Sequence, residues 1–396
     1  MSEQMMIETD GREETAGKKP EKDGGRFETA YQKLKELADR MQDPSTGLEE
    51  SIITTGSVPI FFMMRSSRSK RTASGRKKQT GRIRKAENSR KGPAQEEGND
   101  MRTFEEYLAL TEQHLTDPMP AIGAYAETLE ESMKYSLLSG GKRIRPVMLL
   151  AAAEMAGGTA EEALPYASAI EFIHTYSLIH DDLPAMDDDA LRRGRPTNHM
   201  VYGAGMATLA GDGLLSAAFE IMLGDMIAHQ QDPEALRRRV RAADAIARGA
   251  GVRGMVAGQT ADLASESERP SAPLLTFIHE NKTAAMIIGA IRAGLFLGDA
   301  EEALQNDMER YAYDLGMAFQ VADDILDVVG DEKTLGKSVG QDAQNDKLTW
   351  VSMYGMEASR SRLHELTEDA VSALEKWGSS GDFFRILVRK LEKRTK

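Results

Sequence analysis

The chain has 396 residues, a net charge of −13 and 41% hydrophobic residues, a composition typical of a globular protein with room for a large core. It contains no cysteine, which excludes disulfides and thiolate metal sites. Any bound metal must therefore have oxygen or imidazole ligands, and we expect a cytoplasmic protein. The longest apolar run near the N-terminus, residues 58–64, is far shorter than the ~20 residues that cross a bilayer, so no membrane span is expected.

The first hundred residues differ in composition from the rest of the chain. Residues 62–91 contain twelve Lys or Arg and a single acid, Glu87. Residues 66–98 have almost no large apolar side chain and cannot bury enough surface to offset the entropy of ordering, so we predict a disordered basic linker. The alternative is a nucleic-acid-binding arm. That partner is disfavoured because the segment lacks the interleaved aromatic residues on which bases stack.

A short amphipathic helix is predicted near residues 27–41, before the linker. Apolar and aromatic residues recur there at helical spacing: Phe27, Tyr31, Leu34 and Leu37. Residues 26–51 resemble the first helix and turn of the small subunit of exodeoxyribonuclease VII, but the basic run stands where that family has its second helix. We therefore expect residues 1–100 to be an extension from a fused or frameshifted reading frame, and residues 101–396 to form the main domain, with a natural start at Met101.

Helical periodicity dominates residues 101–396. Two T-x-x-E capping boxes, at residues 103–106 and 159–162, predict that helices begin directly after Thr103 and Thr159. Further helices are predicted over residues 122–138, 165–182, 205–228, 236–255, 273–296, 304–328 and 355–377, and no segment alternates as strands do. The sequence therefore predicts an all-α fold, a single large bundle of about ten helices.

Two aspartate-rich motifs stand at the ends of apolar helical segments. The first is DDLPAMDDD, which begins at Asp181, and the second is DDILD, in which Asp323 and Asp327 are i and i+4 on one helix face. Either motif alone is equally well explained as a solvated helix end. The apolar runs before them, residues 170–179 and 315–322, favour the inner mouth of a bundle. Carboxylates so close together repel one another unless cations lie among them, and oxygen ligands suit Mg²⁺.

Basic residues are placed to bind phosphate between these motifs. The turn SGGKRIRP, residues 139–146, sets two glycines before three cations and a proline that favours a helix start. Without the aspartate motifs, an ordinary interhelix turn would be the better interpretation. His174 lies seven residues before Asp181 on the same helix face, and Lys282 supplies a further charge. The combined pattern predicts a clamp for a diphosphate.

These motifs follow one order along the chain: GGKRIRP, EFIHTYSLIHDDLPAMDDDALRRGRPTNH, NKT, FQVADDILD and GKSVGQDAQNDK. Residues 101–396 therefore resemble the trans-isoprenyl diphosphate synthase family, and specifically its bacterial farnesyl diphosphate synthase type. The resemblance implies a magnesium-dependent transferase that condenses isopentenyl diphosphate with allylic diphosphates. It also implies a homodimer of the isoprenoid synthase fold, with helices around a central cavity. A terpene cyclase is disfavoured because it would carry an Asn/Ser/Glu motif in place of the second aspartate motif.

The resemblance also implies a role for each matched residue. Three Mg²⁺, with Mn²⁺ as an alternative, would be held on the allylic diphosphate by the aspartates of both motifs: Asp181, Asp182, Asp187, Asp323 and Asp327. Cations would grip the same diphosphate: Arg192, Lys282, Lys337 and Lys347. The isopentenyl diphosphate site would comprise Lys142, Arg145, His174 and Arg193, while Thr283 and Gln320 would lie near the allylic C1–O bond. The departures from the family pattern, Ala190 and Gln341, remove no matched ligand.

The expected product depends on the depth of the cavity beneath the first motif. Tyr176 lies five residues before Asp181, about 7.5 Å along the helix, and is followed by Ser177. In an unknown bundle a buried tyrosine here would be ordinary core packing. In this family an aromatic residue at that position resembles the enzymes that make farnesyl diphosphate. C15 is therefore the expected product, and C20 geranylgeranyl diphosphate is the alternative.

Overall fold

The computed structural model describes residues 101–265, 271–329 and 348–394. Contacts between Cα atoms divide the chain between Lys91 and Gly92, and the second unit contains all of the described residues. The helix near 27–41 and the basic linker lie outside the described residues, and so do Lys337 and Lys347. The domain boundary at Met101 stays a prediction.

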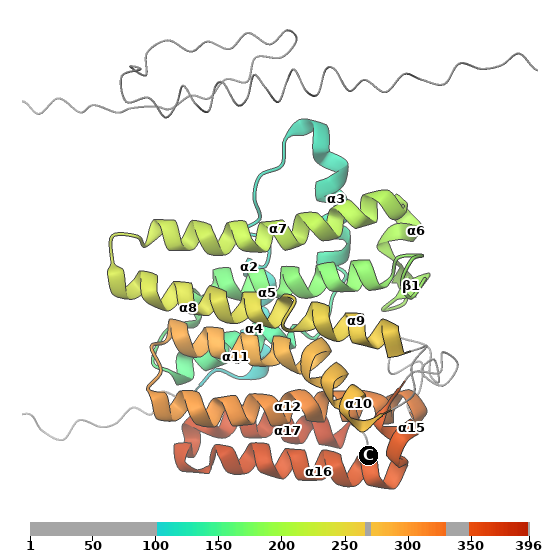
Figure 1. The fold of residues 1–396 in the computed structure, drawn as a ribbon. Coiled ribbons are helices and arrows are strands. Elements are labelled where there is room, and N and C mark those ends of the chain that lie inside the picture. Colours follow the sequence, from blue (N-terminus) through green and yellow to red (C-terminus); the bar gives the residue numbers. More distant parts are fainter. Residues whose placement is uncertain (1–100, 266–270, 330–347, 395–396) are drawn as a thin grey trace, which may run out of the picture. The chain divides into compact units, whose positions relative to one another are not determined.

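The described residues form an all-α bundle, which confirms the predicted fold class (Figure 1). The longer helices are α2 (Phe104–His114), α3 (Glu127–Leu137), α4 (Ile144–Met155), α5 (Ala160–Asp181), α7 (Ala204–Ala228), α8 (Pro233–Ala250), α9 (Met255–Ser265), α11 (Ala285–Leu297), α12 (Glu302–Val329), α16 (Met356–Ala373) and α17 (Asp382–Lys393). Shorter elements are η1 (Ala124–Ala126), α6 (Asn198–Tyr202), α10 (Ala272–Ile278), η2 (His279–Ala284), α15 (Trp350–Tyr354) and η3 (Glu375–Gly381). A small hairpin pairs β1 (Leu191–Arg192) with β2 (Arg195–Pro196).

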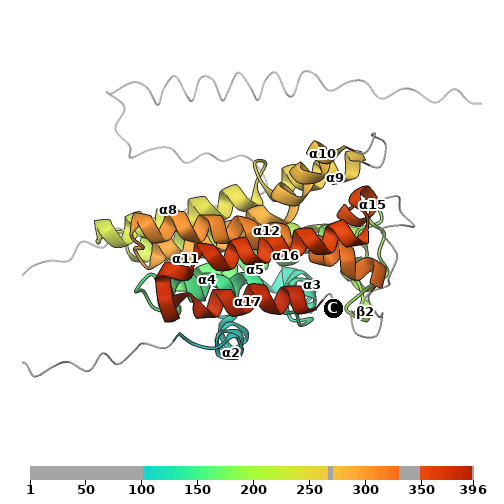
Figure 2. The ribbon, with the colours of Figure 1, turned by 90° about the horizontal axis from the view of Figure 1, so that it is seen from below.

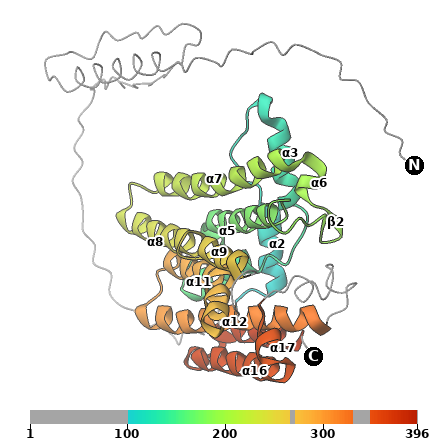
Figure 3. The same cartoon turned by 45° about the vertical axis from the view of Figure 1, so that its right-hand side comes forward.

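The most buried helix is α11, which packs against α4, α8 and α12. From α7 at one edge, the layers of Figure 1 pass through α5 and α8, then α4 and α11, then α12, to α16 and α17. Figure 2 shows α9 and α10 together on one side of the bundle and α2 on the opposite side. In Figure 3, α6 and the hairpin lie at the same end as α3. This packing brings the ends of α5 and α12 and the turn η2 toward one region.

Both predicted capping residues begin their helices. Thr103 forms a reciprocal capping box with Glu106, and the Thr159 hydroxyl accepts from the Glu162 amide at 3.3 Å. The predicted helix over residues 236–255 is wrong over its last turn, because α8 ends at Ala250 and a turn over residues 251–254 leads into α9. At Gly254 a Cβ atom would lie 2.2 Å from the Gly249 carbonyl oxygen, so the chain packs too tightly there for any other residue. Periodicity alone does not reveal such a turn.

Several features escaped the sequence patterns. The predicted helix over 273–296 is continuous but contains the π-helical turn η2, and the helices α6, α9, α15 and α17 were not predicted. The two-residue hairpin turn consists of Arg193 (φ 54°) and Gly194 (φ 73°), both in the left-handed region that such turns need. All are short or depend on tertiary contacts, so local periodicity carries little signal for them.

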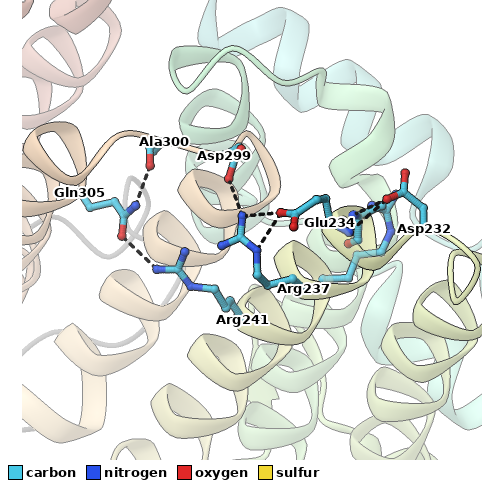
Figure 4. A network of polar contacts seen from close by, with 9 residues as sticks. Asp232, Glu234, Arg237, Arg241, Asp299, Ala300 and Gln305 are labelled. Atoms are coloured by element: carbon cyan, nitrogen blue, oxygen red, sulfur yellow. Dashed lines mark hydrogen bonds and ion pairs between the residues drawn. The ribbon is translucent and has the colours of Figure 1, made fainter.

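A polar network ties the start of α8 to the start of α12 (Figure 4). Asp232 caps α8 by accepting from the Glu234 and Ala235 amides. Arg237 reaches Asp299 at 3.4 Å, and Arg241 donates to the Gln305 side chain at 3.1 Å. These bonds fix the end of the bundle at the α11–α12 loop.

The helix α7, near one edge of the bundle, is long and apolar enough to cross a membrane by length and composition, the one such helix in the described ranges. However, 44% of its most apolar stretch is buried inside the structure, chiefly against α5. A core helix passes the same test of length and composition. We therefore describe α7 as a helix of the bundle, with one exposed apolar face.

The close contact between α11 and α4 yields a stability prediction. A Cβ atom on Gly294 would lie 2.2 Å from the Leu149 carbonyl oxygen, which is backbone and cannot rotate away. Gly294→Ala is expected to lower the free energy of unfolding by about 1–3 kcal/mol, measured by urea denaturation. The control is Gly224→Ala in α7, where no atom lies within 4 Å and the free energy should stay equal or rise by up to about 1 kcal/mol. Equal stability of both variants would refute this packing.

Candidate active site

A cationic cavity of about 430 Å³ lies where the loop before α4 meets α5, α12, η2 and the hairpin. Five cations line it: Lys142, Arg143, Arg145, Arg193 and Arg394. The other polar lining residues are Glu171, His174, Thr283, Gln320 and Asp323. The structure thus brings together the four residues assigned to isopentenyl diphosphate and the two assigned to the reacting bond. Such a concentration of positive charge suits an anion with several charges.

The cationic loop depends on an unusual backbone. Gly140, Gly141 and Arg143 have φ angles of 82°, 149° and 44°, all in the region that favours glycine. A Cβ atom on Gly141 would stand 2.7 Å from a guanidinium nitrogen of Arg193, so the hairpin side chain lies directly against this glycine. The loop and the hairpin therefore hold one another in place.

The charge of the cavity comes from its arginines and Lys142 rather than from His174. Burial holds the pKa of His174 well below its ordinary value, and nearby guanidinium groups, Arg145 first among them, lower it further. The imidazole is therefore neutral at pH 7 and able to donate one hydrogen bond. Burial also lowers the pKa of Arg145 and of Arg193.

A second cavity of about 520 Å³ adjoins the first and shares Arg145, His174 and Thr283 with it. Its walls come from α5, α7, α9 and η2 and are largely apolar, with Met186, Met255, Val256 and Leu263 among them. The two residues assigned to chain length both line it, Tyr176 and Ser177. The Tyr176 ring is buried and packs edge-on against His180, with 5.7 Å between ring centroids. This shape suits a hydrocarbon chain beside a charged head.

Asp181 and Lys282 stand in the wall of the apolar cavity, close to the cationic one. Burial raises the pKa of Asp181 to about 6; the Lys282 charge opposes this rise and the Asp187 carboxylate adds to it. Burial would lower the pKa of Lys282, but Asp262, Asp181 and Asp187 outweigh it and raise that pKa. Lys282 donates to Asp262 in α9 at 2.5 Å, so the side chain is fixed from behind.

Asp182 is paired with a cation in this structure. It is 3% exposed, and the Arg192 guanidinium lies 2.6 Å from its Oδ1 atom. Asp189 lies 3.7 Å from the same guanidinium. Asp182, which the family resemblance assigns as a metal ligand, is thus paired with Arg192, which it assigns to the allylic diphosphate. The ion pair links the end of α5 to the hairpin.

The second motif divides its aspartates between two environments. Asp323 lines the cationic cavity, whereas Asp324 is buried and accepts from the Trp350 amide at 2.7 Å. His279 lies 3.6 Å from Asp324 and accepts at Nδ1 from the Trp350 indole at 3.1 Å. Burial lowers the pKa of His279 to about 4, so its ring is neutral. Asp327, one turn beyond Asp323, is buried at 3% exposure.

Within the described ranges, no three His, Asp or Glu side chains are grouped as ligands of one metal ion. The donor chemistry nevertheless fits a hard cation, because the Asp187 carboxylate helps to raise the pKa of Asp181 and of Asp182, and all three side chains offer only oxygen. These residues belong to the end of α5 and its following loop, while Asp323 and Asp327 belong to α12. A cation that neutralises both groups would relieve their repulsion.

Taken together, an α-helical bundle with a cationic cavity next to an apolar one defines an enzyme that handles diphosphates of apolar chains. The chain belongs to the polyprenyl synthetase family, whose model matches residues 126–377. It is a short-chain prenyltransferase of isoprenoid biosynthesis, which confirms the family resemblance of the sequence.

Known relatives make two different products by name. The chain is 46% identical over 241 residues to the geranylgeranyl diphosphate synthase of Cyanophora paradoxa, covering 61% of this chain and 79% of the relative. It is 41% identical over 262 residues to the farnesyl diphosphate synthase of Bacillus subtilis, covering 66% and 84%. A solved FPP/GFPP synthase from Zymomonas mobilis superposes with a TM-score of 0.63 at 33% identity, covering 73% of this chain and 97% of that one. The comparisons therefore establish the family.

Three residues of the site were missed by sequence reasoning. Asp262 binds Lys282 from another helix, Glu171 lies buried in the cationic cavity, and Arg394 reaches that cavity from the end of α17. A polar residue within the apolar run of α5 was a signal for Glu171. The other two depend on long-range packing that no local pattern shows.

The Asp262–Lys282 pair yields the second prediction. Asp262→Asn removes the charge that fixes Lys282, so KM for the diphosphate held by Lys282 is expected to rise about tenfold, the effect of about 1.4 kcal/mol. Steady-state kinetics with each isoprenoid substrate varied in turn measures it. Asp244→Asn, which breaks the exposed pair with Arg248, is the control and should leave KM unchanged. Equal KM values in wild type and Asp262→Asn would contradict this role.

Proposed function

We propose that the protein condenses isopentenyl diphosphate with dimethylallyl diphosphate and then with geranyl diphosphate, and releases (2E,6E)-farnesyl diphosphate. The observation that carries this proposal is the pair of adjoining cavities, one cationic and one apolar, which share Arg145, His174 and Thr283. Two diphosphate substrates meet at such a boundary with their reactive carbons close together. A cytoplasmic location is part of the proposal, and cell fractionation tests it.

The charges divide the two substrates between the cavities. Isopentenyl diphosphate would lie in the cationic cavity, bound by Lys142, Arg145, His174 and Arg193. The allylic chain would enter the apolar cavity, with its diphosphate near Lys282 and Arg192. The proposal keeps Lys337 and Lys347, which lie outside the described residues, as further ligands of this diphosphate. Thr283 and Gln320 line the cationic cavity on the side of η2 and α12, where the reacting carbons would meet.

The reaction needs no protein nucleophile. The allylic C1–O bond breaks and its electron pair leaves with the diphosphate, which the surrounding cations stabilise. The isopentenyl double bond supplies the electron pair for the new C–C bond, and a proton is lost to the released diphosphate. The buried cations hold both diphosphates, and the apolar walls exclude water from the carbocation.

A divalent cation completes the proposed site. The family uses Mg²⁺ in catalysis, and Mg²⁺ supplies positive charge that stabilises the departing diphosphate when it is bound. We propose three ions, with Mn²⁺ as an alternative, held by the aspartates of both motifs: Asp181, Asp182, Asp187, Asp323 and Asp327. In this proposal the ion replaces the proton that Asp181 holds below about pH 6.

The third prediction tests the carboxylates of the two motifs. Asp181→Asn and Asp323→Asn are each expected to lower kcat by about two to three orders of magnitude, because transition-state charge loses its stabilisation. Asp188→Asn is the matched control, since Asp188 is exposed and Asn also tolerates its φ of 51°. Single-turnover rates across a Mg²⁺ titration give the measurement. Turnover near the wild-type value in either variant would refute the assignment.

The farnesyl product rests on Tyr176. Its buried ring lies in the wall of the apolar cavity five residues before Asp181, where a growing chain would meet it. Geranylgeranyl diphosphate is the alternative product, because the relatives include synthases of both names.

The fourth prediction follows from that ring. Tyr176→Ala is expected to deepen the apolar cavity and shift the main product from C15 to C20 or longer, measured by chromatography of the dephosphorylated products. Tyr176→Phe keeps the ring and should leave the product unchanged. A wild-type C20 product would show that the farnesyl proposal is wrong, and a C15 product from Tyr176→Ala would place the floor elsewhere.

We also propose that two copies of the chain associate through α7. This helix lies at the edge of the bundle (Figure 1), and its outer face exposes Leu209, Phe219, Leu223 and Ile227. Monomers rarely expose four large apolar side chains on one helix face, and a two-fold axis would set this face against its own copy.

The fifth prediction tests the dimer. Leu223→Glu buries a charge in the proposed interface and is expected to convert a dimer to a monomer in sedimentation equilibrium. Ile386→Glu changes a similarly exposed residue of α17 and should leave the dimer intact. A wild-type monomer would contradict the proposal.

A further inference from the structure

Glu171 is a buried carboxylate inside a cavity for anions. It lies in α5 one turn before His174, on the same helix face, and only 2% of its surface is exposed. Its Oε2 atom has no hydrogen-bond partner among the residues that the structure describes. Negative charge at this place repels a diphosphate, so the residue must have a role that outweighs the repulsion.

That role is visible at Arg143. The Arg143 guanidinium donates to three acceptors, each at 2.7 Å: Glu171 Oε1, Glu112 Oε1 and the Leu137 carbonyl. The side chain is 1% exposed, and turning it toward a substrate would break these buried contacts. Arg143 lines the cavity together with Lys142 and Arg145, but its guanidinium is held by these contacts and belongs to the framework of the site.

The backbone of Arg143 needs this support. Its φ of 44° lies in the left-handed region, which is unfavourable for a non-glycine residue. Arg143 also stands directly before α4, so its conformation sets the direction of Lys142 on one side and of Arg145 in the first turn on the other. Of its two acidic partners, Glu112 is 39% exposed and replaceable by water, whereas Glu171 is not.

We propose that Glu171 is a positioning residue for isopentenyl diphosphate. Its carboxylate fixes Arg143, and Arg143 in turn fixes the loop that presents Lys142 and Arg145 to the cationic cavity. The inference rests on the proposed assignment of that cavity to isopentenyl diphosphate. It assigns Glu171 no contact with the reacting atoms.

Positioning and simple charge balance predict opposite results. If Glu171 only offsets the surplus positive charge, its neutralisation would strengthen diphosphate binding. If Glu171 positions the loop, its neutralisation weakens binding, because breaking the buried ion pair leaves Arg143 with Glu112, its half-exposed partner, as the one carboxylate that holds it. The direction of the change in KM therefore decides between the two roles.

The experiment compares Glu171→Gln and Glu171→Asp with wild type, at saturating geranyl diphosphate and varied isopentenyl diphosphate. Both variants are expected to raise KM for isopentenyl diphosphate about tenfold, since Gln lacks the charge and Asp is too short to reach Arg143. KM for geranyl diphosphate should change by less than about threefold. Arg143→Gln should raise KM for isopentenyl diphosphate to a similar extent. In the double variant Glu171→Gln/Arg143→Gln, this KM should be no higher than in either single variant, because both changes break the same ion pair.

Two controls separate the possible failures. Glu162→Gln alters an exposed carboxylate on the same helix and should leave both KM values unchanged. Arg145→Gln should raise KM for isopentenyl diphosphate, and an unchanged value would overturn the substrate assignment itself. If Arg145→Gln acts as expected, the positioning role is overturned by a lower KM in Glu171→Gln or a wild-type KM in Glu171→Asp. Thermal melting of each variant in the full chain verifies folding, and Glu171→Asp still decides if Glu171→Gln fails to fold.

Discussion

Charged groups in the interior of an apolar helical bundle must be paired, because an isolated buried charge is very unfavourable. The site of this protein satisfies that constraint with pairs that join different elements. Arg143 binds Glu171 between the glycine loop and α5, Arg192 binds Asp182 between the hairpin and α5, and Lys282 binds Asp262 between η2 and α9. Each pair fixes a charged side chain of the site relative to a neighbouring element. The electrostatics that permit folding thus also position the reactive groups.

Close backbone contacts also position parts of the site, without charged groups. The turn η2 passes so near α9 that a Cβ atom on Gly258 would lie 2.0 Å from the Lys282 amide nitrogen. On its other side, Gly316 of α12 lies against Ala284, where a Cβ atom would meet the Ala284 side chain at 2.5 Å. A π-helical turn carries one more residue than an α-turn, so it rotates the side chains that follow. Small neighbours therefore let η2 bring Lys282 and Thr283 to the boundary of the two cavities.

The sequence predicts the parts of this structure that depend on local order. Each of these parts, the aspartate motifs, the glycine loop and the Thr103 cap, lies within one short stretch of sequence. Its chemistry can therefore be predicted without knowledge of the fold. The break at Gly251 and the π-turn η2 lie within helical periodicity and change only its phase, so they were not visible. Asp262 and Lys282 are twenty residues apart and on different elements, and no local pattern in either segment predicts that they pair. The sequence does not show which opposite charge pairs with each substrate-binding residue.

The carboxylates of the first motif show why such support is needed. The folded protein raises the pKa of Asp181 from the ordinary 3.8 to about 6, so it binds that proton more tightly than the unfolded chain does. As pH rises from 3.8 to about 6, the unfolded chain releases this proton before the folded protein does. The free energy of unfolding therefore falls over this pH range, and the loss remains at neutral pH. Lys282 offsets part of the deficit, and a cation with its diphosphate would offset more. The framework of ion pairs thus holds mutually repelling carboxylates close together, and substrate binding would relieve this repulsion where the charge of the reaction develops.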